Sequence, residues 1–325
     1  MSIKIIKAGI LDTVQDLGRY GHQASGINPG GAMDKYALQV ANALVGNDPG
    51  EAAIEMHFPA SVYLFTKPTL IALSGADFSP SINGEPVPLL HPVMIGKNDL
   101  LHFQKPVSGA RAYLSVRGGF ALEQWMGSYS TNLKSGAGGF KGRALMKEDS
   151  IPLRKSVEKN YVGIKVLPWQ AVIEKQEDPH ELLVLAGHEW DWLTEDAKDN
   201  FGMTSFVITQ QSDRMGYRLN NIPLPVKTNE ELVSSAVSFG TVQLLPDGKL
   251  IILAADHQTT GGYPRIAHVV SAHHSKLAQL KAGDKIHFKF TDISKAEKMI
   301  VKQELYLKQL RNSCIFRLGD FLKGL

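Results

Sequence analysis

The segment Asp256–Pro264 (DHQTTGGYP) is the part of this chain whose residue types are best suited to binding a ligand. It begins with five consecutive hydrogen-bonding side chains and ends in Gly-Gly-Tyr-Pro. Apolar runs on both sides, Leu250–Ala255 and Ile266–Val270, predict two buried strands that this segment connects. A solvated turn needs Gly and Pro, but it does not need five polar side chains. The composition suggests a loop that grips a small polar ligand, although polar loops are more often structural.

A second candidate cluster lies in Thr13–Gly21 (TVQDLGRYG). Gln15, Asp16 and Arg19 offer an amide, a carboxylate and a guanidinium within five residues. Arginine suits bidentate recognition of a planar carboxylate, so a ligand carboxylate is one expected partner. The alternative is that Asp16 and Arg19 pair with each other, and the residues alone favour that alternative.

Two glycine-containing segments invite an anion-binding interpretation. In Gly30–Asn42 (GGAMDKYALQVAN) two glycines precede a predicted helix, and the N-terminus of such a helix can bind an anion. The alternative is that Asp34 only caps that helix. Gly127–Thr131 (GSYST) and Gly136–Arg143 (GAGGFKGR) lack the G-x-x-x-x-G-K-[ST] pattern of a phosphate loop. A non-standard anion nest and a flexible surface loop remain as alternatives, and the residues favour the surface loop.

Ser212–Leu219 (SDRMGYRL) places Asp213, Arg214 and Arg218 around Met-Gly. In one interpretation an Asp–Arg pair closes a turn after a strand. In the other, one guanidinium faces a ligand and the carboxylate orients it. Chemistry alone does not choose between them.

Other catalytic patterns are not found. Histidines 257, 268, 273 and 274 lack metal-ligand spacing, and His273 and His274 as neighbours on a strand would point to opposite faces, so no metal site is predicted. A serine-nucleophile elbow, G-x-S-x-G, is absent. The single cysteine, Cys314, cannot form an intramolecular disulfide and is expected to be packed or inert.

The elements that must position these clusters are mostly strands. Short apolar runs between Gly, Pro, Asn and Asp turns predict ten strands: Ile3–Lys7, Thr69–Ser74, Leu100–Gln104, Arg111–Val116, Gly163–Leu167, Leu182–Leu185, Ser205–Gln210, Leu250–Ala255, Ile266–Val270 and Lys285–Phe290. Helical spacing predicts one helix over Asp34–Val45, stopped by Gly46. Ser294 and Glu297 have capping-box spacing and predict a second helix from Ser294 toward Arg311.

A weak internal repeat suggests how these strands are divided. Gly96–Phe103, Lys147–Leu153 and Ala282–Phe288 each place an Asp before an alternating apolar strand, as turn-to-strand entries do in β-barrels. We therefore expect two related β domains, 1–160 and 161–291, with the junction near Val157–Tyr161 and a helical tail over 292–325. The predicted strands do not alternate regularly with long helices, which counts against a doubly wound fold.

Composition restricts the partners and the compartment. The formal net charge of +3 is too small to indicate nucleic acid or an anionic membrane as a partner. No apolar run is long enough to span a bilayer, and Met1–Ile10 lacks the pattern of a signal peptide. A cytoplasmic protein is the expectation.

Taken in order, VQDLGR, GAMD before a helix ending in AN, GSYST, SDRMGYRL and DHQTTGGYP resemble the allophanate hydrolase subunit 2 family. Other names for this family are biotin-dependent carboxyltransferase, KipA-like, or the C subunit of 5-oxoprolinase. The resemblance runs from about Gly9 to about Phe288. It implies a mainly β fold with two tandem cyclophilin-like β-barrel domains, a few short helices and a C-terminal helix.

The resemblance also implies function and partners. The leading expectation is the C subunit of an ATP-dependent 5-oxoprolinase, which opens 5-oxo-L-proline to L-glutamate together with a KipI-like B subunit and a LamB/YcsF-like A subunit. ATP would act through the complex, and this chain would be inactive alone. One alternative is a carboxyltransferase that moves a carboxyl group from carboxybiotin to urea or a related amide, with biotin as cofactor. Another is a KipA-like regulator that antagonises a KipI-like kinase inhibitor.

These substrates share a planar amide carbonyl with an adjacent N–H, so a site needs a donor, an acceptor and stabilisation of oxyanion charge. We expect Asp256 to accept from the substrate N–H, Thr259, Thr260 and the glycine amides to donate to oxygen, and Arg214 to hold a carboxylate or phosphoryl group. The family commonly has Arg at the position of His257. The histidine in this chain therefore removes a permanent positive charge from the site. The remaining predicted substrate-binding residues are Gln15, Asp16, Arg19, Met33, Asp34, Asn42, Ser130, Thr131, Asp213, Arg218, Gln258, Gly261, Gly262 and Tyr263.

Overall fold

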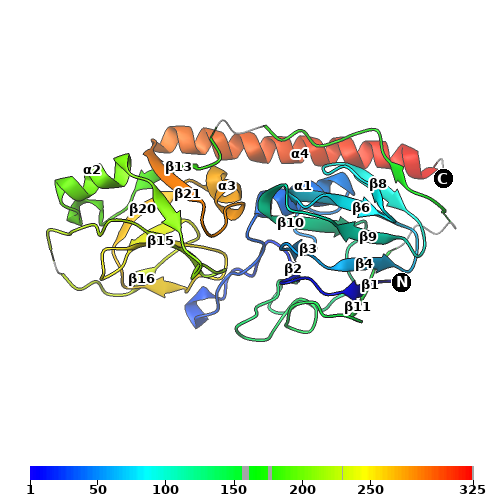
Figure 1. Ribbon diagram of the computed structural model, residues 1–325, viewed down its shortest axis with the longest axis horizontal. Coiled ribbons are helices and arrows are strands. Elements are labelled where there is room, and N and C mark those ends of the chain that lie inside the picture. The colour runs from blue at the N-terminus through cyan, green and yellow to red at the C-terminus, as the bar shows by residue number, and fades with distance from the viewer. Residues whose placement is uncertain (156–160, 175–177, 229, 324–325) are drawn as a thin grey trace. The chain divides into compact units, whose positions relative to one another are not determined.

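The computed structural model describes residues 1–155, 161–174, 178–228 and 230–323. Two compact units make up the chain (Figure 1). Unit 1 comprises Met1–Arg19, Asp34–Glu174 and Glu304–Leu325, and unit 2 comprises Tyr20–Met33 and Lys175–Gln303. The change of unit at 174/175 falls later than the predicted junction, of which residues 157–160 lie outside the described residues. The segment predicted as a separate helical tail contributes residues to both units.

Unit 1 contains two six-stranded sheets. The first has the order β11 (Ser150–Pro152), β1 (Ser2–Lys7), β4 (Val62–Phe65), β9 (Leu100–Phe103), β6 (Pro80–Ile82) and β7 (Glu85–Pro86). The second has the order β12 (Lys165–Val166), β8 (Pro92–Ile95), β5 (Thr69–Asp77), β10 (Ser108–Val116), β3 (Ala53–Met56) and β2 (Thr13–Gln15). Alternate residues of both sheets, such as Ile3 of β1 and Leu73 of β5, point inward and form one apolar core.

Unit 2 is a closed barrel with the order β13 (Glu181–Ala186), β20 (Arg265–Val269), β17 (Thr241–Leu244), β18 (Leu250–Leu253), β15 (Gly216–Asn220), β14 (Phe206–Ile208) and β21 (Lys285–Phe290). The parallel pair of β13 and β21 closes it. A separate two-stranded ladder joins β16 (Ser235–Ala236) to β19 (Thr260–Gly261). Inward-facing residues such as Val242 and Ile252 form the barrel core. The mainly β fold expected from the sequence is thereby confirmed.

Helices cover parts of both units. In unit 1, α1 (Lys35–Leu44) begins at its N-cap Asp34, whose side chain accepts from Ala37 N at 2.9 Å, and the chain turns at Gly46 with φ of 71°. Unit 2 holds α2 (Glu195–Met203), α3 (His274–Ala278) and three 3-10 turns, η1 (Gln23–Ser25), η2 (Trp190–Trp192) and η3 (Ser271–His273). His273 and His274 are not strand neighbours, the case considered from the sequence, because the chain turns into η3 and α3 after β20.

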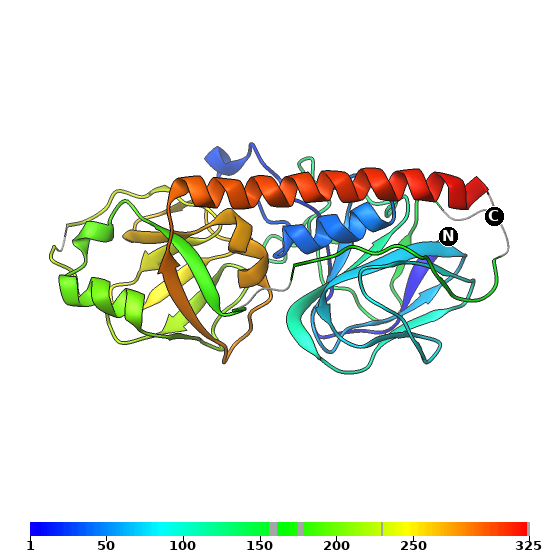
Figure 2. The ribbon, with the colours of Figure 1, turned by 90° about the horizontal axis from the view of Figure 1, so that it is seen from above.

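The long helix α4 (Ile293–Lys323) exceeds its prediction at both ends. Asp292 caps it by accepting from Lys295 N at 2.8 Å, so the helix begins before Ser294. It continues past Arg311 because Leu310, Cys314 and Leu318 recur at four-residue spacing and are buried in unit 1 beside Leu167. Figure 2 shows these later turns running alongside α1. In the described part of the chain, no helix is long and apolar enough to cross a membrane.

The three repeated Asp segments make the same turn. Asp99, Asp149 and Asp284 each precede a strand, respectively β9, β11 and β21. The Oδ2 atom of each accepts a hydrogen bond from the backbone N–H three residues earlier, at 2.7, 2.8 and 2.9 Å. A carboxylate in this position supplies the acceptor that a tight turn otherwise lacks. The sequence repeat therefore reflects a shared local structure in both units.

Candidate functional site

The DHQTTGGYP loop lies on the surface of unit 2 between β18 and β20. Its centre forms β19, which pairs with β16 in the register Ser235 to Gly261 and Ala236 to Thr260. The side chains of Thr260 and Tyr263 are exposed, whereas Gln258 and Thr259 are half-buried. The loop thus presents hydroxyl groups to solvent from a short ladder that is separate from the barrel sheet.

Arg214 and Asp256 form a bidentate ion pair at the base of this loop. Arg214 Nε donates to Asp256 Oδ2 at 2.8 Å and Nη2 donates to Oδ1 at 3.1 Å. The two side chains are only 8% and 15% exposed. Arg214 Nη2 also donates to the carbonyl oxygen of Gly31 at 2.5 Å. The structure therefore brings the two residues together, and the carboxylate that Arg214 binds here is that of Asp256.

The segment Tyr20–Met33 contacts both members of the Arg214–Asp256 pair. Asn28 Nδ2 donates to the backbone oxygen of Asp256 at 3.0 Å, and Met33 is buried in the core of unit 2. Gly31 has a φ of 92°, a conformation that favours glycine, where its carbonyl meets Arg214. Of the predicted binding residues in GAMD, Met33 thus acts through packing in this structure.

The other charged residues of SDRMGYRL do not join Arg214. Asp213 Oδ1 accepts from Met215 N at 2.8 Å and Gly216 N at 3.3 Å, which closes the turn before β15. Arg218 is exposed on β15. Asp213 thus closes the turn through backbone N–H groups, and Arg214 pairs with Asp256 of the loop. A guanidinium that faces a ligand stays a prediction.

His257, the position that departs from the family, is buried and only 5% exposed. Its Nδ1 lies 2.5 Å from the carbonyl oxygen of Gln258. A carbonyl oxygen only accepts, so this contact places a proton on Nδ1. The imidazole faces the loop backbone, and the solvent-facing side of the loop is left to Thr260 and Tyr263.

In unit 1 a second group of predicted residues converges on Asp16. Its Oδ1 accepts from Gly18 N at 2.7 Å, Ser128 Oγ at 2.7 Å and Ser130 Oγ at 2.5 Å. Its Oδ2 accepts from Tyr129 N at 2.6 Å. Four donors on one buried carboxylate make Asp16 the organising centre of the GSYST segment.

Gln15, Arg19 and Thr131 lie around this centre. Gln15 Nε2 donates to Thr13 Oγ1 at 3.0 Å and to the carbonyl oxygen of Thr131 at 3.3 Å. Arg19 Nη2 donates to the carbonyl oxygen of Ser130, and its guanidinium lies 4.6 Å from the ring centre of Trp125. The sequence placed Gln15, Asp16 and Arg19 in one cluster and Thr131 in another, so the contacts that join the two segments were not predicted.

The glycine-rich segment packs directly on this group. A Cβ atom on Gly138 would lie 2.2 Å from the Ser130 carbonyl oxygen, and one on Gly139 would lie 1.9 Å from Thr131 Oγ1. Both glycines have positive φ. Close approach to protein backbone and side chain thus explains these glycines without a bound phosphate.

Asp34 and Asn42 are buried within unit 1. Besides capping α1, Asp34 donates its backbone N–H to Tyr113 Oη at 2.8 Å, and Tyr113 donates to Glu55 Oε2 at 2.6 Å. Burial, and then the nearby Glu55 charge, raise the pKa of Tyr113 well above its usual value. Asn42 Nδ2 donates to the Glu51 carbonyl oxygen at 2.7 Å. The buried Glu55–Tyr113 pair has no motif around it and was not predicted.

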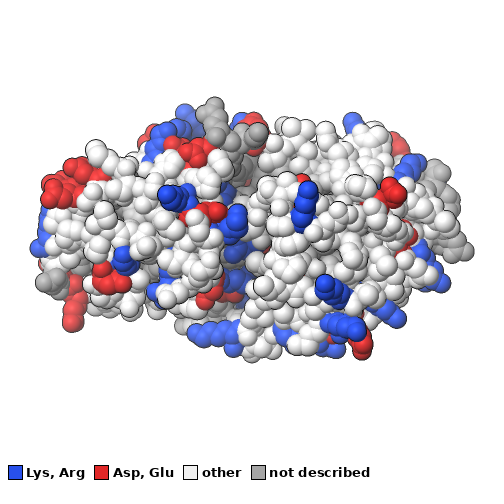
Figure 3. Space-filling model, in the orientation of Figure 1, with Lys and Arg blue, Asp and Glu red and all other residues white. Residues whose placement is uncertain are grey.

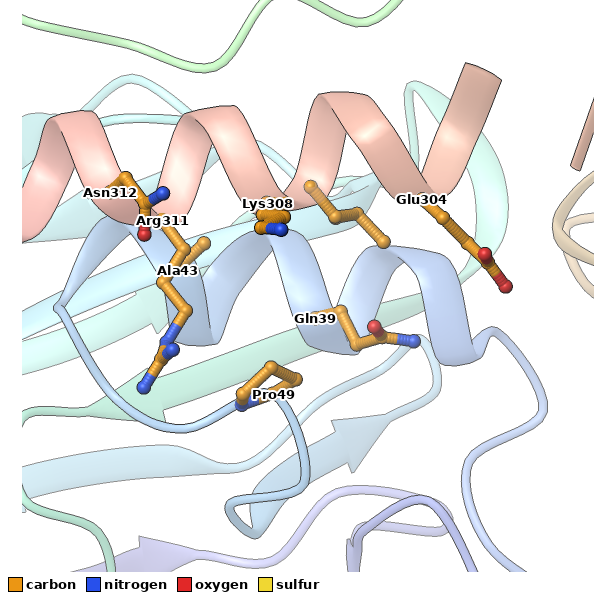
Figure 4. A pocket seen from close by; sticks show the side chains of 8 residues that line it. Gln39, Ala43, Pro49, Glu304, Lys308, Arg311 and Asn312 are labelled. Atoms are coloured by element: carbon orange, nitrogen blue, oxygen red, sulfur yellow. The ribbon is translucent and has the colours of Figure 1, made fainter. Parts of the chain in front are cut away.

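A cavity of about 370 Å³ lies elsewhere in unit 1 (Figure 4). It is lined by Gln39 and Ala43 of α1, by Pro49 and by five residues of α4. One of these, Arg311, pairs with Asp48 and donates to the Asn47 carbonyl oxygen at 3.2 Å. The predicted site residues do not line this cavity. On the face drawn in Figure 3, acidic and basic side chains are interspersed, in keeping with the small net charge.

Comparison with known proteins identifies the class. Residues 25–290 match the family model "carboxyltransferase domain, subdomain A and B", and the chain belongs to this family. The resemblance seen in its motifs is thereby confirmed. The crystal structure of Kluyveromyces lactis urea carboxylase shares the fold with a TM-score of 0.87 and 26% identity, over 95% of this chain and 29% of that one.

Particular relatives fall into two groups. The C subunit of 5-oxoprolinase from Escherichia coli K12 is 38% identical over 95% of this chain and 97% of its own length. The protein of the same name from Haemophilus influenzae is 34% identical over 92% and 94%. The urea amidolyase of Saccharomyces cerevisiae is 28% identical over 98% of this chain but only 18% of its own length.

Proposed function

We propose that this chain is the C subunit of an ATP-dependent 5-oxoprolinase complex, acting with a KipI-like and a LamB/YcsF-like partner. The observation that carries this proposal is the end-to-end match to the two 5-oxoprolinase proteins, which the chain covers over 97% and 94% of their lengths. In the urea enzymes the same sequence corresponds to one segment of a much longer protein.

The loop of unit 2 supplies the groups that a lactam requires. The hydroxyl groups of Thr259 and Thr260, with the amides of Gly261 and Gly262, donate to the lactam oxygen. Asp256 accepts from the lactam N–H. A carboxylate has about four acceptor positions, and Arg214 uses one on each oxygen, so acceptor capacity remains on Asp256.

This geometry changes the role proposed for Arg214. Its guanidinium is engaged by Asp256 and by the Gly31 carbonyl oxygen. We therefore assign it to orienting Asp256, and not to holding a substrate carboxylate. The fixed pair is preorganised, which is how charged groups stabilise developing charge in a transition state at least cost.

ATP enters as a substrate of the whole complex, where it supplies the phosphoryl group that activates the lactam carbonyl. The Asp16 cluster of unit 1 orders the GSYST segment, whose Ser130 and Thr131 are held through side chain and backbone. The residues that hold the GSYST segment in position are therefore Gln15, Asp16, Arg19, Ser130 and Thr131.

The test is reconstitution of the three purified proteins. We expect phosphate release that depends on 5-oxoproline, with glutamate formed in equal amount. Asp256→Asn should lower kcat/KM by roughly 100-fold, which corresponds to about 3 kcal/mol of transition-state stabilisation. Asp149→Asn is the matched control, because it breaks a bidentate Asp–Arg pair with Arg143 at 2.7 and 2.8 Å in unit 1. That control should keep kcat/KM within about two-fold of the wild type.

A complex without 5-oxoproline-dependent ATP hydrolysis would remove this proposal. The second candidate is a carboxyltransferase for urea or a related amide, which the urea carboxylase fold match over 95% of the chain supports. It predicts exchange of a carboxyl group between carboxybiotin and urea. The regulatory alternative predicts that Asp256→Ala leaves the antagonism of a KipI-like inhibitor unchanged.

A further inference from the structure

Gln243 is a fully buried glutamine whose amide is unsatisfied. It lies on β17 with 0% of its surface exposed. Within the described residues, neither Oε1 nor Nε2 has a hydrogen-bond partner. A buried amide in this state has lost its hydration without compensation, and such groups are uncommon in folded proteins. Packing alone gives no reason for a glutamine here.

The amide lies directly beneath the DHQTTGGYP loop. Val242 and Leu244 of β17 point into the barrel core, so Thr241 and Gln243 lie on the outer face of that strand. A Cβ atom on Gly261 would be 2.6 Å from Gln243 Nε2 and 3.5 Å from Gln258 Nε2. Two carboxamides therefore flank Gly261, whose lack of a side chain leaves room for the Gln243 amide.

Unit 1 contains a similar glutamine. The triplet Thr-Val-Gln forms β2 at 13–15 and begins β17 at 241–243. In both strands the valine, Val14 or Val242, is in the core of its unit, and the glutamine is 0% exposed. Gln15 Nε2 is satisfied by Thr13 and Thr131, whereas its Oε1 has no partner in the described part of the chain. Each unit thus holds a glutamine with unused hydrogen-bonding capacity beside a predicted site loop.

We propose that Gln243 is a specificity-determining residue that binds the planar cis amide of the substrate. This inference rests on the proposed function. A carboxamide presents a C=O acceptor beside an N–H donor, and a lactam presents the complementary N–H and C=O on the same edge. Gln243 Nε2 donates to the lactam oxygen, and the single lactam N–H is shared by Gln243 Oε1 and Asp256 in a three-centre hydrogen bond. An amide left unpaired in the free protein is satisfied only when this substrate is bound.

The loop above Gln243 is suited to give access. Gly261 belongs to β19, which is joined to β16 by two residue pairs and lies outside the barrel sheet. Few backbone hydrogen bonds must break for this ladder to lift, so local opening there costs little compared with unfolding the barrel. The substrate reaches Gln243 when the ladder lifts, and Thr259 and Thr260 then close over it.

The first test replaces Gln243 by Met, which keeps the volume and removes both polar groups. In the reconstituted complex, Gln243→Met should raise KM for 5-oxoproline by about ten-fold or more with little change in kcat, while Tm stays equal or rises. Gln303→Met is the matched control, because Gln303 Nε2 donates to the Ala272 carbonyl oxygen at 2.9 Å. It should lower Tm and leave KM unchanged. A lower Tm with unchanged KM for Gln243→Met would overturn the inference.

The second test compares two glycines of unit 2, one beside Gln243 and one distant from the loop in sequence. Gly261→Ala places a methyl group against the Gln243 amide and should raise KM as Gln243→Met does. Gly202→Ala, at an exposed position of α2 where an added Cβ meets no atom within 4 Å, is the control and should keep KM within about two-fold. The double variant Gly261→Ala with Gln243→Ala should recover Tm but not KM. Recovery of both would show that Gln243 only packs against the loop.

The two proposals fail in different ways. An active complex in which Gln243→Met has the wild-type KM overturns this inference alone. A complex without 5-oxoproline-dependent activity overturns the proposed function, and Gln243 is then tested by direct binding. The Gln243 side-chain amide signals, assigned by their loss in Gln243→Met, are followed by NMR while 5-oxoproline, 2-pyrrolidone or urea is added. Movement with a cyclic amide supports the inference, and no movement with any of the three overturns it.

Discussion

At the scale of single residues, the Arg214–Asp256 pair illustrates what a charged pair in a loop accomplishes. Its contacts join the turn before β15, the Gly31 backbone and the start of the DHQTTGGYP loop. A pair that is largely removed from water is expensive to break, because either charge left alone is poorly solvated. The pair therefore holds the loop in one conformation. Its value lies in that fixed geometry and less in its net contribution to the free energy of unfolding.

His273 gives a residue-scale prediction about pH. Its Nδ1 accepts from Leu183 N at 3.0 Å, and burial, followed by the charge of Lys276, lowers its pKa to about 4. Below an unfolded-state pKa of about 6.5, the unfolded chain binds a proton that the folded chain does not. The free energy of unfolding should therefore fall by about 3 kcal/mol in total as pH drops from about 6.5 to about 4.

The variant His273→Asn isolates this contribution, because Asn keeps an acceptor for Leu183 N and does not titrate. Chemical denaturation of both proteins at several pH values gives the comparison. Stability should shift by about 3 kcal/mol in favour of the variant between pH 7.5 and pH 4. A pH-independent difference between the two would contradict the low pKa of His273.

At the scale of elements, the glycine-rich segment acts as a close-packed cover of Ser130 and Thr131. Gly139→Ala would place Cβ at 1.9 Å from Thr131 Oγ1, whereas Gly136→Ala meets no atom within 4 Å. Both positions have positive φ, of 56° and 62°. The Gly136 variant should lose about 1–2 kcal/mol through its backbone conformation alone. The Gly139 variant should lose at least about 2 kcal/mol more, as overpacking does.

Thermal unfolding of the two variants measures this difference, and activity of the complex measures its effect on the site. The Gly139 variant should also lose activity, because the GSYST segment must move. Equal stability losses at the two positions would mean that the segment yields easily and does not hold Ser130 and Thr131 in place.

Elements with a regular apolar pattern were predicted from the sequence, and elements with a weak pattern were missed. All ten predicted strands overlap observed ones, because short apolar runs between turn residues are distinctive. The helix α2 was missed because nine residues show little helical periodicity, and β17 was missed because half its residues are polar on the outer face. The motifs indicated which residues lie near each loop. They could not show that Asp256 binds Arg214, because that contact joins residues 42 positions apart in sequence.

At the scale of the whole molecule, Cys314 reports whether α4 is docked. It is the only cysteine, it is 1% exposed, and burial raises its pKa to about 11. The expectation that it is packed is confirmed. At pH 8 the thiolate fraction is then more than about 100-fold below that of a free cysteine, and the thiolate is the reactive form. Labelling by an aromatic disulfide should therefore be at least about 100-fold slower in the native protein than in urea.

Two neighbours on α4 provide the comparison. Leu318 is 1% exposed beside Cys314 in the unit 1 core, and Phe316 is 74% exposed. Leu318→Ala should cost about 2–5 kcal/mol and speed the labelling of Cys314. Phe316→Ala should leave the labelling rate unchanged. Rapid labelling of the native wild type would show that the later turns of α4 detach readily.

The composition of unit 1 has a consequence for biosynthesis. The unit is assembled from three stretches of the chain, and residues 304–325 are among them. Its core beside Leu167 and Ala171 needs Leu310, Cys314 and Leu318. A ribosome that has released the first 174 residues has therefore not yet supplied all of unit 1, and apolar surface stays open while unit 2 is translated. Synthesis is a period of aggregation risk for this chain, and a chaperone that covers this surface until α4 emerges should raise the yield of folded protein.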